Sequence, residues 1–251
     1  MPQIDDFFLS SNTVSDIPEG EYQKVDVLID SFDALSRITY QSLYIIDYHK
    51  KNFLYVSNNP LFLCGHSAEE VQKLGYMFYL KHVPEEEQAM LLEINQVGFQ
   101  FFSKIPIEKR LYHTISYSFH LVNQKKKILI NHSLTPILLT NEGKIWLAAC
   151  VVSLPSRNTI GNIEIRQVNE ASFWKYSIED HCWKEDKGVI LNEKERDILS
   201  LSAQGYIMKE IADKLCLALD TVKFHKRNLF EKLEVKNITE AIAFATNNKL
   251  F

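Results

Sequence analysis

Four basic side chains lie close together near the carboxyl end of the 251-residue chain: Lys223, Lys226, Arg227 and Lys232. Only one acidic residue, Glu231, falls within the same stretch. Clustered Lys and Arg side chains attract the phosphates of nucleic acid, and this attraction acts over a Debye length of roughly 8–10 Å. A local basic stripe therefore predicts nucleic-acid binding more directly than the charge of the whole chain does.

The spacing of these residues predicts a helix with one basic face and one apolar face. Lys223 and Arg227 are four positions apart, so a helix places them on the same side, with Phe224 next to them. Val222 and Leu229 point away from that side and are expected to enter a core. Such a helix suits the major groove of DNA, where its N-terminal residues can reach the base edges.

The total charge conceals this asymmetry. The chain holds 28 Lys and Arg against 32 Asp and Glu, which gives a formal net charge of −4. The segment from Val189 onward has ten basic and nine acidic residues and is +1, whereas the preceding 188 residues have 18 and 23 and are −5. The negative total therefore does not exclude a nucleic-acid partner.

Other kinds of chemistry find little support in the sequence. No G-x-S-x-G, P-loop or G-x-G-x-x-G motif occurs, so an enzyme is not predicted. Cys64, Cys150, Cys182 and Cys216 form no C-x-x-C pair, and no Cys/His cluster has zinc-ligand spacing, so neither a metal site nor another cofactor is expected. The three carboxylates of Glu85–Glu87 are explained by the dipole of a helix that begins there.

The helices predicted after residue 188 would position the basic stripe. Asn192 is placed to cap the first helix, with Glu195 three residues later. A short second helix, Met208–Leu215, is followed by a three-residue connection and a third helix, Asp220–Leu233. A fourth helix is expected over Ile238–Asn247. Two helices joined by so tight a turn have the geometry of a helix-turn-helix.

This segment resembles the DNA-binding domains of the LuxR/FixJ/NarL family. The resemblance covers about 60 residues, a quarter of the chain, and uses many positions in fixed register. Those positions are Leu191, Glu195, Arg196, Ile198, Leu199, Ala203, Gly205, Lys209–Ala212, Leu215, Thr221–Lys223, His225, Asn228, Lys232, Leu233, Glu240 and Ala241. The resemblance implies an all-α domain of four helices that binds double-stranded DNA.

The same resemblance implies separate roles for the exposed side chains. Lys223, Phe224 and Arg227 occupy the positions at which the family reads base edges; Arg227 would pair with a guanine and Phe224 would contact a thymine methyl group. Contacts with phosphates position the helix without reading the sequence. The residues suited to them are Lys209, Thr221, His225 and Lys226. For His225, a hydrogen-bonded structural role is an equal alternative.

The chain departs from the family at two helix starts. The family usually has Ser or Asn where this chain has Ile207 and Met208, and Ser where it has Ala218. Both serines would cap helices, and the loss of such a cap costs about 1 kcal/mol. We therefore expect weaker DNA binding, or binding that depends more on dimerisation.

The preceding residues predict an α+β module. A one-faced helix over Tyr22–Ile38 is followed by a hairpin of two strands, by short helices and one longer helix up to Phe102, and by a three-stranded antiparallel meander. Helices are expected to pack on one face of this antiparallel sheet. The expected division is an arm at 1–20, the α+β domain at 21–154, a connector with a β-hairpin at 155–188 and the helical domain at 189–251.

This order of elements resembles a PAS domain. The residues that carry the resemblance are Phe53–Asn58, Phe62, Gly65–Val71, Leu74, Gly75 and His82–Glu86. PAS domains bury a small ligand between sheet and helices, or serve as dimer platforms. Tyr76 and Phe78 are the candidate pocket residues, with plain core packing as the alternative. The signature of flavin-binding light sensors is missing, because Cys64 precedes the turn at Gly65.

Together these patterns predict a cytoplasmic, homodimeric transcriptional regulator. Its PAS-like module would sense a small ligand or a partner and control how two helix-turn-helix domains dock in the major groove. The longest apolar run, Ile145–Val152, is eight residues, and no secretory signal is evident, so no membrane partner is expected. The alternative is a PAS-mediated interaction or dimerisation protein without a small-molecule ligand.

Overall fold

The computed structural model describes residues 2–170, 172–248 and 250, which form two compact units. The first unit consists of the chain up to Ser153 together with Thr159–Asp186. The second consists of Leu154–Asn158 and the chain from Lys187 onward, and each unit has hydrophobic cores of its own. The boundaries expected from the sequence stay a prediction, but most of the expected connector at 155–188 lies within the first unit.

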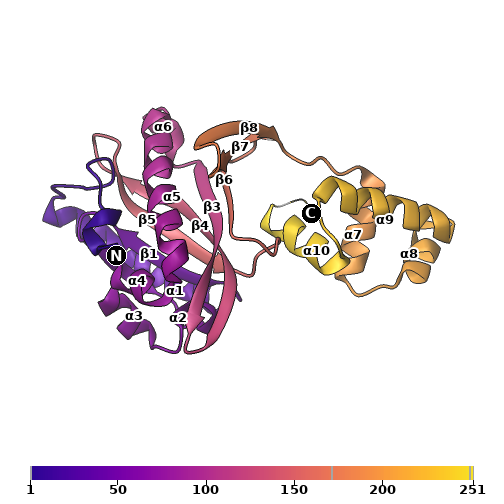
Figure 1. Cartoon of the computed structure of the whole chain (residues 1–251), viewed down its shortest axis with the longest axis horizontal. Coiled ribbons are helices and arrows are strands. Elements are labelled where there is room, and N and C mark those ends of the chain that lie inside the picture. Colours follow the sequence, from indigo (N-terminus) through magenta and orange to yellow (C-terminus); the bar gives the residue numbers. More distant parts are fainter. Residues whose placement is uncertain (1, 171, 249, 251) are drawn as a thin grey trace. The chain divides into compact units, whose positions relative to one another are not determined.

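An antiparallel sheet is the framework of the first unit (Figure 1). Its strands are β1 (Ser42–Asp47), β2 (Asn52–Val56), β3 (His113–Asn123), β4 (Lys126–Leu139), β5 (Ile145–Ser153), β6 (Gly161–Gln167), β7 (Ser172–Ser177) and β8 (Cys182–Lys187). Their order is β2-β1-β5-β4-β3-β6-β7-β8. Cys150 of β5 lies opposite Tyr44 of β1 and Leu134 of β4, so β5 joins the hairpin to the meander. The predicted α+β class is confirmed.

Helices connect the strands and make up the second unit. Those of the first unit are α1 (Gln23–Ser36), α2 (Pro60–Leu63), α3 (Ala68–Leu74), α4 (Met77–His82), α5 (Glu85–Lys104) and α6 (Ile107–Arg110), with short 3-10 helices at Ile4–Phe7 and Glu19–Tyr22. Those of the second unit are α7 (Glu193–Ala203), α8 (Met208–Leu215), α9 (Leu219–Leu233) and α10 (Ile238–Asn247). Within the described residues, no helix combines the length and apolar character that crossing a bilayer requires.

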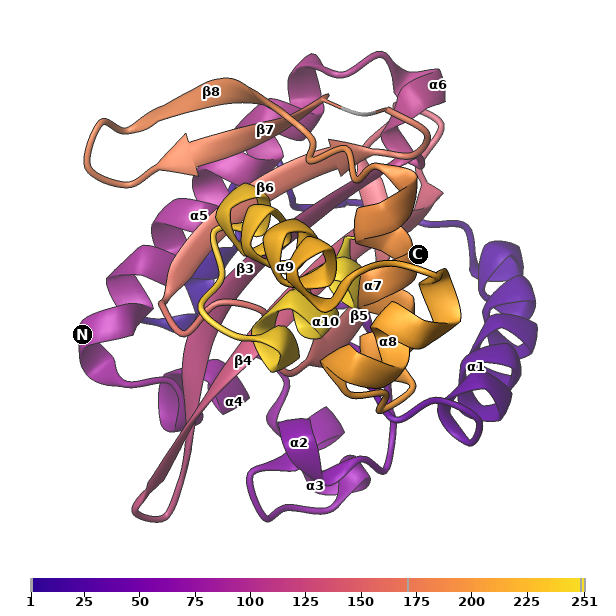
Figure 2. The ribbon, with the colours of Figure 1, turned by 90° about the vertical axis from the view of Figure 1, so that its right-hand side faces the viewer.

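The two faces of the sheet have separate cores, because successive side chains of a strand point in opposite directions. Tyr44 and Ile46 of β1 belong to the large core that α2–α5 cover, whereas Ile45 packs with Trp146 and with Val25 of α1. Figures 1 and 2 show α5 and α1 on opposite sides of the sheet. The helix predicted over Tyr22–Ile38 therefore uses its apolar face to cover the sheet.

The segment expected to be an N-terminal arm packs into the large core of the first unit. Phe7 and Val14 are buried in the large core, and the Phe7 ring lies 5.5 Å from the Tyr76 ring, measured between centroids. The amide of Asn95 on α5 donates to the carbonyl of Phe7 at 2.8 Å. The polar composition of residues 1–20 concealed this docking, since only a few of their apolar side chains provide it.

The strands of the expected connector extend the sheet rather than standing apart. β6 pairs with β3, with Ile115 opposite Ile165, and β7 pairs with β6. Asn162, the second residue of β6, donates its side-chain amide to Thr159 in the preceding turn. β8 has no counterpart in the sequence prediction, because its charged, exposed residues lack the apolar alternation by which a half-buried strand is recognised.

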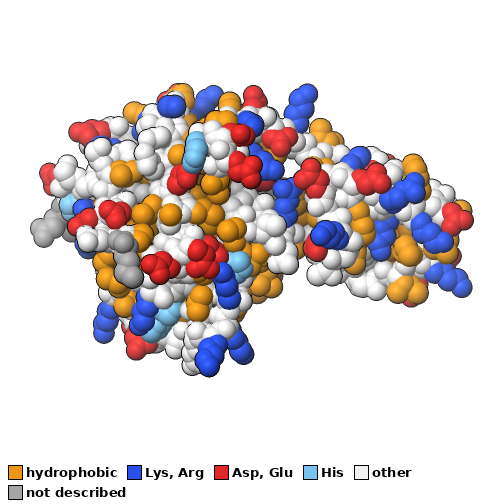
Figure 3. Space-filling model, viewed as in Figure 1, with side chains coloured by type: hydrophobic (Ala, Val, Ile, Leu, Met, Phe, Trp, Pro, Cys, Tyr) orange, Lys and Arg blue, Asp and Glu red, His pale blue; other side chains and the backbone are white. Residues whose placement is uncertain are grey.

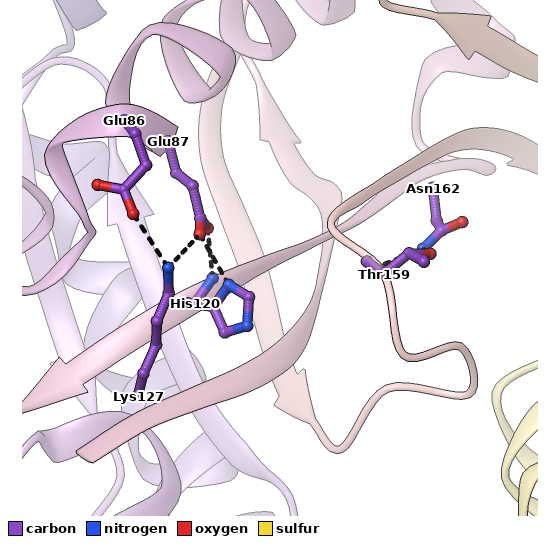
Figure 4. A network of polar contacts seen from close by, with 6 residues as sticks. All are labelled: Glu86, Glu87, His120, Lys127, Thr159 and Asn162. Atoms are coloured by element: carbon purple, nitrogen blue, oxygen red, sulfur yellow. Dashed lines mark hydrogen bonds and ion pairs between the residues drawn. The ribbon is translucent and has the colours of Figure 1, made fainter.

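A buried carboxylate joins the start of α5 to the β3–β4 hairpin (Figure 4). The Glu87 side chain is 3% exposed and accepts hydrogen bonds from the backbone NH of His120 at 2.8 Å and from its Nδ1 at 2.7 Å. Lys127 Nζ lies 3.1 Å from the Glu87 carboxylate and 3.1 Å from that of Glu86, which is 70% exposed. The sequence analysis explained Glu85–Glu87 by the helix dipole alone. For Glu87 that explanation is incomplete, because its carboxylate also binds His120 and Lys127.

The neighbouring carboxylates offer a matched pair of substitutions. We expect Glu87→Gln to lower the free energy of unfolding by about 1–3 kcal/mol, because an amide satisfies this set of buried donors less well. Glu86→Gln should change it little, since Glu86 is exposed to water. Urea denaturation followed by circular dichroism measures both. Equal effects of the two substitutions would contradict a structural role for Glu87.

Candidate nucleic-acid interface and internal cavity

Helices α8 and α9 meet through a turn of three residues, Cys216–Ala218. Cys216 has a positive φ of 52°, and the NH of Leu217 bonds back to the carbonyl of Ala212 at 2.9 Å, which ends α8. Ile211 and Ala212 of α8 pack with Val222 of α9 and with Ile198 of α7. This core fixes the orientation of α9 on α8.

The face of α9 opposite that core carries the residues predicted to read bases. Val222, Leu229 and Leu233 are fully buried, whereas Lys223, Phe224 and Arg227 are exposed. The Arg227 guanidinium lies 5.8 Å from the centre of the Phe224 ring. The predicted trio is thus held together on one exposed surface, and Figure 3 shows Lys and Arg side chains over this part of the second unit.

A shallow groove runs along this surface of α9. Lys223 and Arg227 line it together with Lys226, and Met208 at the start of α8 contributes to its wall. Lys226 Nζ lies 5.5 Å from the centre of the Phe230 ring, and Lys223 Nζ pairs with Asp220 at 2.9 Å. The Asp220 side chain is 91% exposed, so this pair can open at little cost.

The predicted phosphate-contacting residues lie on the two helices around the turn. Lys209 is exposed on the first turn of α8, and Thr221 is partly exposed on the first turn of α9. The His225 ring packs edge-on against the Phe224 ring, with centroids 5.6 Å apart. Among these residues only Lys226 lines the groove.

Lys232 has a different role from the rest of the basic stripe. Its Nζ lies 2.7 Å from Oε2 of Glu195, whose side chain is 1% exposed. The same carboxylate accepts from the backbone NH of Asn192 at 3.0 Å, while Asn192 caps α7 through the NH of Glu195 at 2.8 Å. Lys232 therefore ties α9 to the start of α7, and charge counting alone could not separate it from the groove lysines.

The first unit encloses a small cavity between α5, the sheet and the N-terminal arm. The space that the centre of a water-sized sphere can reach is about 50 Å³. Tyr76 lies in its wall, whereas Phe78, the other pocket candidate, does not. Phe78 is fully buried and packs on Phe62 and His82, because residues two apart on a helix point in nearly opposite directions.

Uncharged polar groups line the cavity among apolar ones. The lining residues that carry such groups are Tyr48, Tyr76, Tyr79, Tyr117 and Asn95. Tyr117 lies on the covered face of β3, between the buried Ile115 and Phe119, yet remains partly exposed, which indicates that its ring faces the cavity.

A hydrogen-bonded chain of buried groups extends from the cavity wall into the core. The hydroxyl of Tyr44 contacts both the hydroxyl of Tyr79 and Nε2 of His132. Burial lowers the pKa of His132 to about 3, so its ring is neutral near pH 7. Burial also raises the pKa of Tyr76 and that of the Cys150 thiol, so these groups are neutral too. His132, Tyr76 and Cys150 are therefore all uncharged near pH 7.

The paired helices α8 and α9, their tight turn and the exposed basic face of α9 define a helix-turn-helix domain of the DNA-binding type. Residues 189–245 match the family model described as bacterial regulatory proteins, luxR family. The second unit thus contains a domain of the LuxR family, as the sequence resemblance predicted.

Two curated relatives match the same end of the chain. The oxygen regulatory protein NreC of Staphylococcus haemolyticus (strain JCSC1435) is 39% identical over 83 residues, which are 33% of this chain and 37% of that protein. NreC of Staphylococcus carnosus (strain TM300) is 43% identical over 61 residues, or 24% and 28% of the two chains. The chain spans about a third of the length of these relatives.

Two solved structures align with most of the chain. One is the complex of phage VqmA with DPO, at a TM-score of 0.34, with 17% identity and 92% of each chain covered. The other is the Vibrio cholerae VqmA dimer in the absence of target DNA, at a TM-score of 0.35, with 15% identity and 88% of each chain covered. TM-scores this low establish neither a shared arrangement nor a shared function.

The bare starts of α8 and α9 agree with the departures seen in the sequence. Ile207 and Ala218 stand at the N-cap positions and offer no oxygen to the free NH groups of the first turn, and Glu210 only bonds the NH of Ile207 at 2.9 Å. Ala218 already has the extended backbone of a capping residue, with φ −65° and ψ 145°.

We expect Ala218→Thr to stabilise the second unit by about 0.5–2 kcal/mol relative to Ala218→Val, which has the same shape without the hydroxyl. The threonine Oγ would accept from an NH in the first turn of α9. Hydrogen exchange of the α9 amides in the full chain measures the difference. Equal protection in the two variants would show that no cap forms at this position.

Proposed function

We propose that this chain is a sequence-specific DNA-binding transcriptional regulator that inserts α9 into the major groove. The single observation that carries the proposal is the exposed basic face of α9, placed opposite a fully buried apolar face within a LuxR-family domain. An α-helix fits the major groove, and each base pair presents there a distinct pattern of donors and acceptors.

In this proposal Arg227 donates two hydrogen bonds to a guanine, and Phe224 contacts a thymine methyl group. The ion pair between Lys223 and Asp220 opens, and Lys223 then binds a base edge or a phosphate. Lys209, Thr221, His225 and Lys226 bind phosphates and set the register of α9 in the groove. Lys232 stays on Glu195 and contacts no DNA.

Fluorescence anisotropy on a binding site selected from random duplexes tests these roles. We expect Arg227→Ala to cost about 1–3 kcal/mol in binding and to relax the preference at one base pair. Lys226→Ala should weaken binding to all sequences alike. It should also reduce the slope of log affinity against log salt concentration by about one, the value for one phosphate contact. Lys184→Ala, which removes an exposed lysine paired with Asp180 in the first unit, is the control and should leave affinity unchanged.

Affinity that is equal for the wild-type protein and for the double variant Lys223→Ala/Arg227→Ala would refute the DNA-binding role. A flat dependence on salt would also contradict it, because contacts with several phosphates release counterions and make binding weaken steeply as salt rises.

We also propose that the first unit is a PAS-type sensor whose cavity takes a small uncharged molecule, and that occupancy alters how a homodimer presents its two α9 helices. The neutral tyrosine hydroxyls and apolar walls support an uncharged, mainly apolar ligand with one or two polar groups. The exposed side chains of Val27 and Leu35 on α1, and of Ile38 after it, support dimer contacts there.

p-Cresol, a neutral phenol, is a suitable probe of the cavity. Titration followed by methyl NMR should shift the signals of Ile46, Ile94 and Ile115, which line it. Ile94→Phe should weaken this binding about tenfold or more by filling the space, whereas Phe78→Leu, a core change outside the wall, should not. Far-UV circular dichroism confirms that both variants fold. Saturable binding that Ile94→Phe leaves unchanged would place the probe elsewhere.

The small size of the cavity favours a second candidate function. The cavity volume of about 50 Å³ is far below the roughly 300–1,000 Å³ typical of ligand pockets. If p-cresol does not bind, the first unit is better described as a dimerisation or partner-docking platform without a ligand.

A further inference from the structure

Two histidines face each other at one end of the first unit. His66 follows the turn at Gly65, between α2 and α3, and His82 is the last residue of α4. Their Nε2 atoms are 3.0 Å apart, and the rings are nearly perpendicular, with an interplanar angle of 78°. His82 is 8% exposed, whereas His66 keeps part of its surface in contact with water.

The distal nitrogens of both rings have partners that direct the Nε2 atoms toward each other. Nδ1 of His82 donates to the carbonyl of Val122 on β3 at 2.9 Å, since a carbonyl can only accept. In a neutral ring this leaves a lone pair on Nε2. Nδ1 of His66 lies 3.6 Å from a carboxylate oxygen of Glu70, which also accepts from the NH of Ser67 at 2.8 Å. A carbonyl or carboxylate on the distal nitrogen is the arrangement that orients metal-bound histidines.

We propose that His66 and His82 form a two-histidine site for a divalent transition-metal ion, which both rings bind through Nε2. Without metal, the two nitrogens share one proton, with His66 donating from Nε2. Binding then requires His66 to move that proton to Nδ1, where it faces Glu70, and neither ring loses its proton to solvent.

The separation of the two nitrogens favours one geometry over another. Two ligands at about 2.0–2.1 Å from one metal and 3.0 Å from each other subtend an angle of about 95°. This is close to the right angle between neighbouring ligands in tetragonal Cu²⁺ and Ni²⁺ complexes, and narrower than the tetrahedral angle of Zn²⁺ sites. Imidazole affinity is greatest for Cu²⁺ among these ions.

The site is open and exchangeable rather than structural. Across the described ranges, no group of three or more His, Cys, Asp or Glu residues is placed to hold a metal. Water molecules therefore complete the coordination, and the bound ion would link the end of α4 to the turn before α3.

Isothermal titration of the full chain with CuCl₂, in glycine buffer to suppress weak binding, tests the proposal. We expect one ion per chain for the wild-type protein and an affinity about tenfold or more lower for His66→Gln and for His82→Gln. His49→Gln is the matched control, because Nδ1 of His49 also faces a carbonyl, that of Val14 at 3.1 Å, and the ring is partly buried. It should bind Cu²⁺ as the wild type does.

Electron paramagnetic resonance of the 1:1 complex gives a second readout. Splitting from two imidazole nitrogens is expected in the wild type and from one in each single variant. If burial of His82 prevents its variant from folding, as circular dichroism would show, the partly exposed His66 carries the test. Wild-type affinity in His66→Gln, or a wild-type spectrum identical to that of His66→Gln, overturns the proposal.

Discussion

Burial of strand β1 on both of its faces is the constraint on which the first unit depends. All six of its residues are buried, so the sheet needs a layer of side chains on each side. Helices α2–α5 and Phe7 of the arm supply one layer, and Val25 of α1 supplies part of the other. This requirement explains why the apolar face of α1 packs on the sheet, while Val27 and Leu35 of the same helix remain exposed.

In the second unit, the buried carboxylate of Glu195 gives Lys232 a structural role that the other lysines of α9 do not have. Glu195 holds both the cap of α7 and the ammonium group of Lys232, so α9 is attached near its C-terminal end. The backbone of α9 is therefore held at both ends, by Val222 in the core near its start and by Lys232 near its end, while the Lys223 side chain keeps a surface ion pair that can open.

Periodicity and local chemistry decided which parts of the structure could be predicted. The bounds of α8 and α10 were predicted correctly, because apolar residues at helical spacing are a property of a short segment. Docking of Phe7, pairing of β6 with β3, and the charged strand β8 depend on distant partners, which the local pattern does not contain. The pocket residues were predicted only in part for the same reason: Tyr76 was a candidate and lines the cavity, whereas Tyr48 and Tyr117 come from distant parts of the chain that only the fold brings to it.

The second unit is not continuous in sequence. Leu154–Asn158 belongs to it, although Thr159–Asp186 returns to the first unit before the LuxR-family domain begins. Within this unit Arg157 pairs with Glu234 at the end of α9, at 3.2 Å, and lies over the Phe244 ring of α10. The second unit is therefore not a module that can be cut out or exchanged at a single junction. A chimera joined at residue 188 would carry the helices of this domain but would lack the short loop, encoded 30 residues earlier, that packs on two of them.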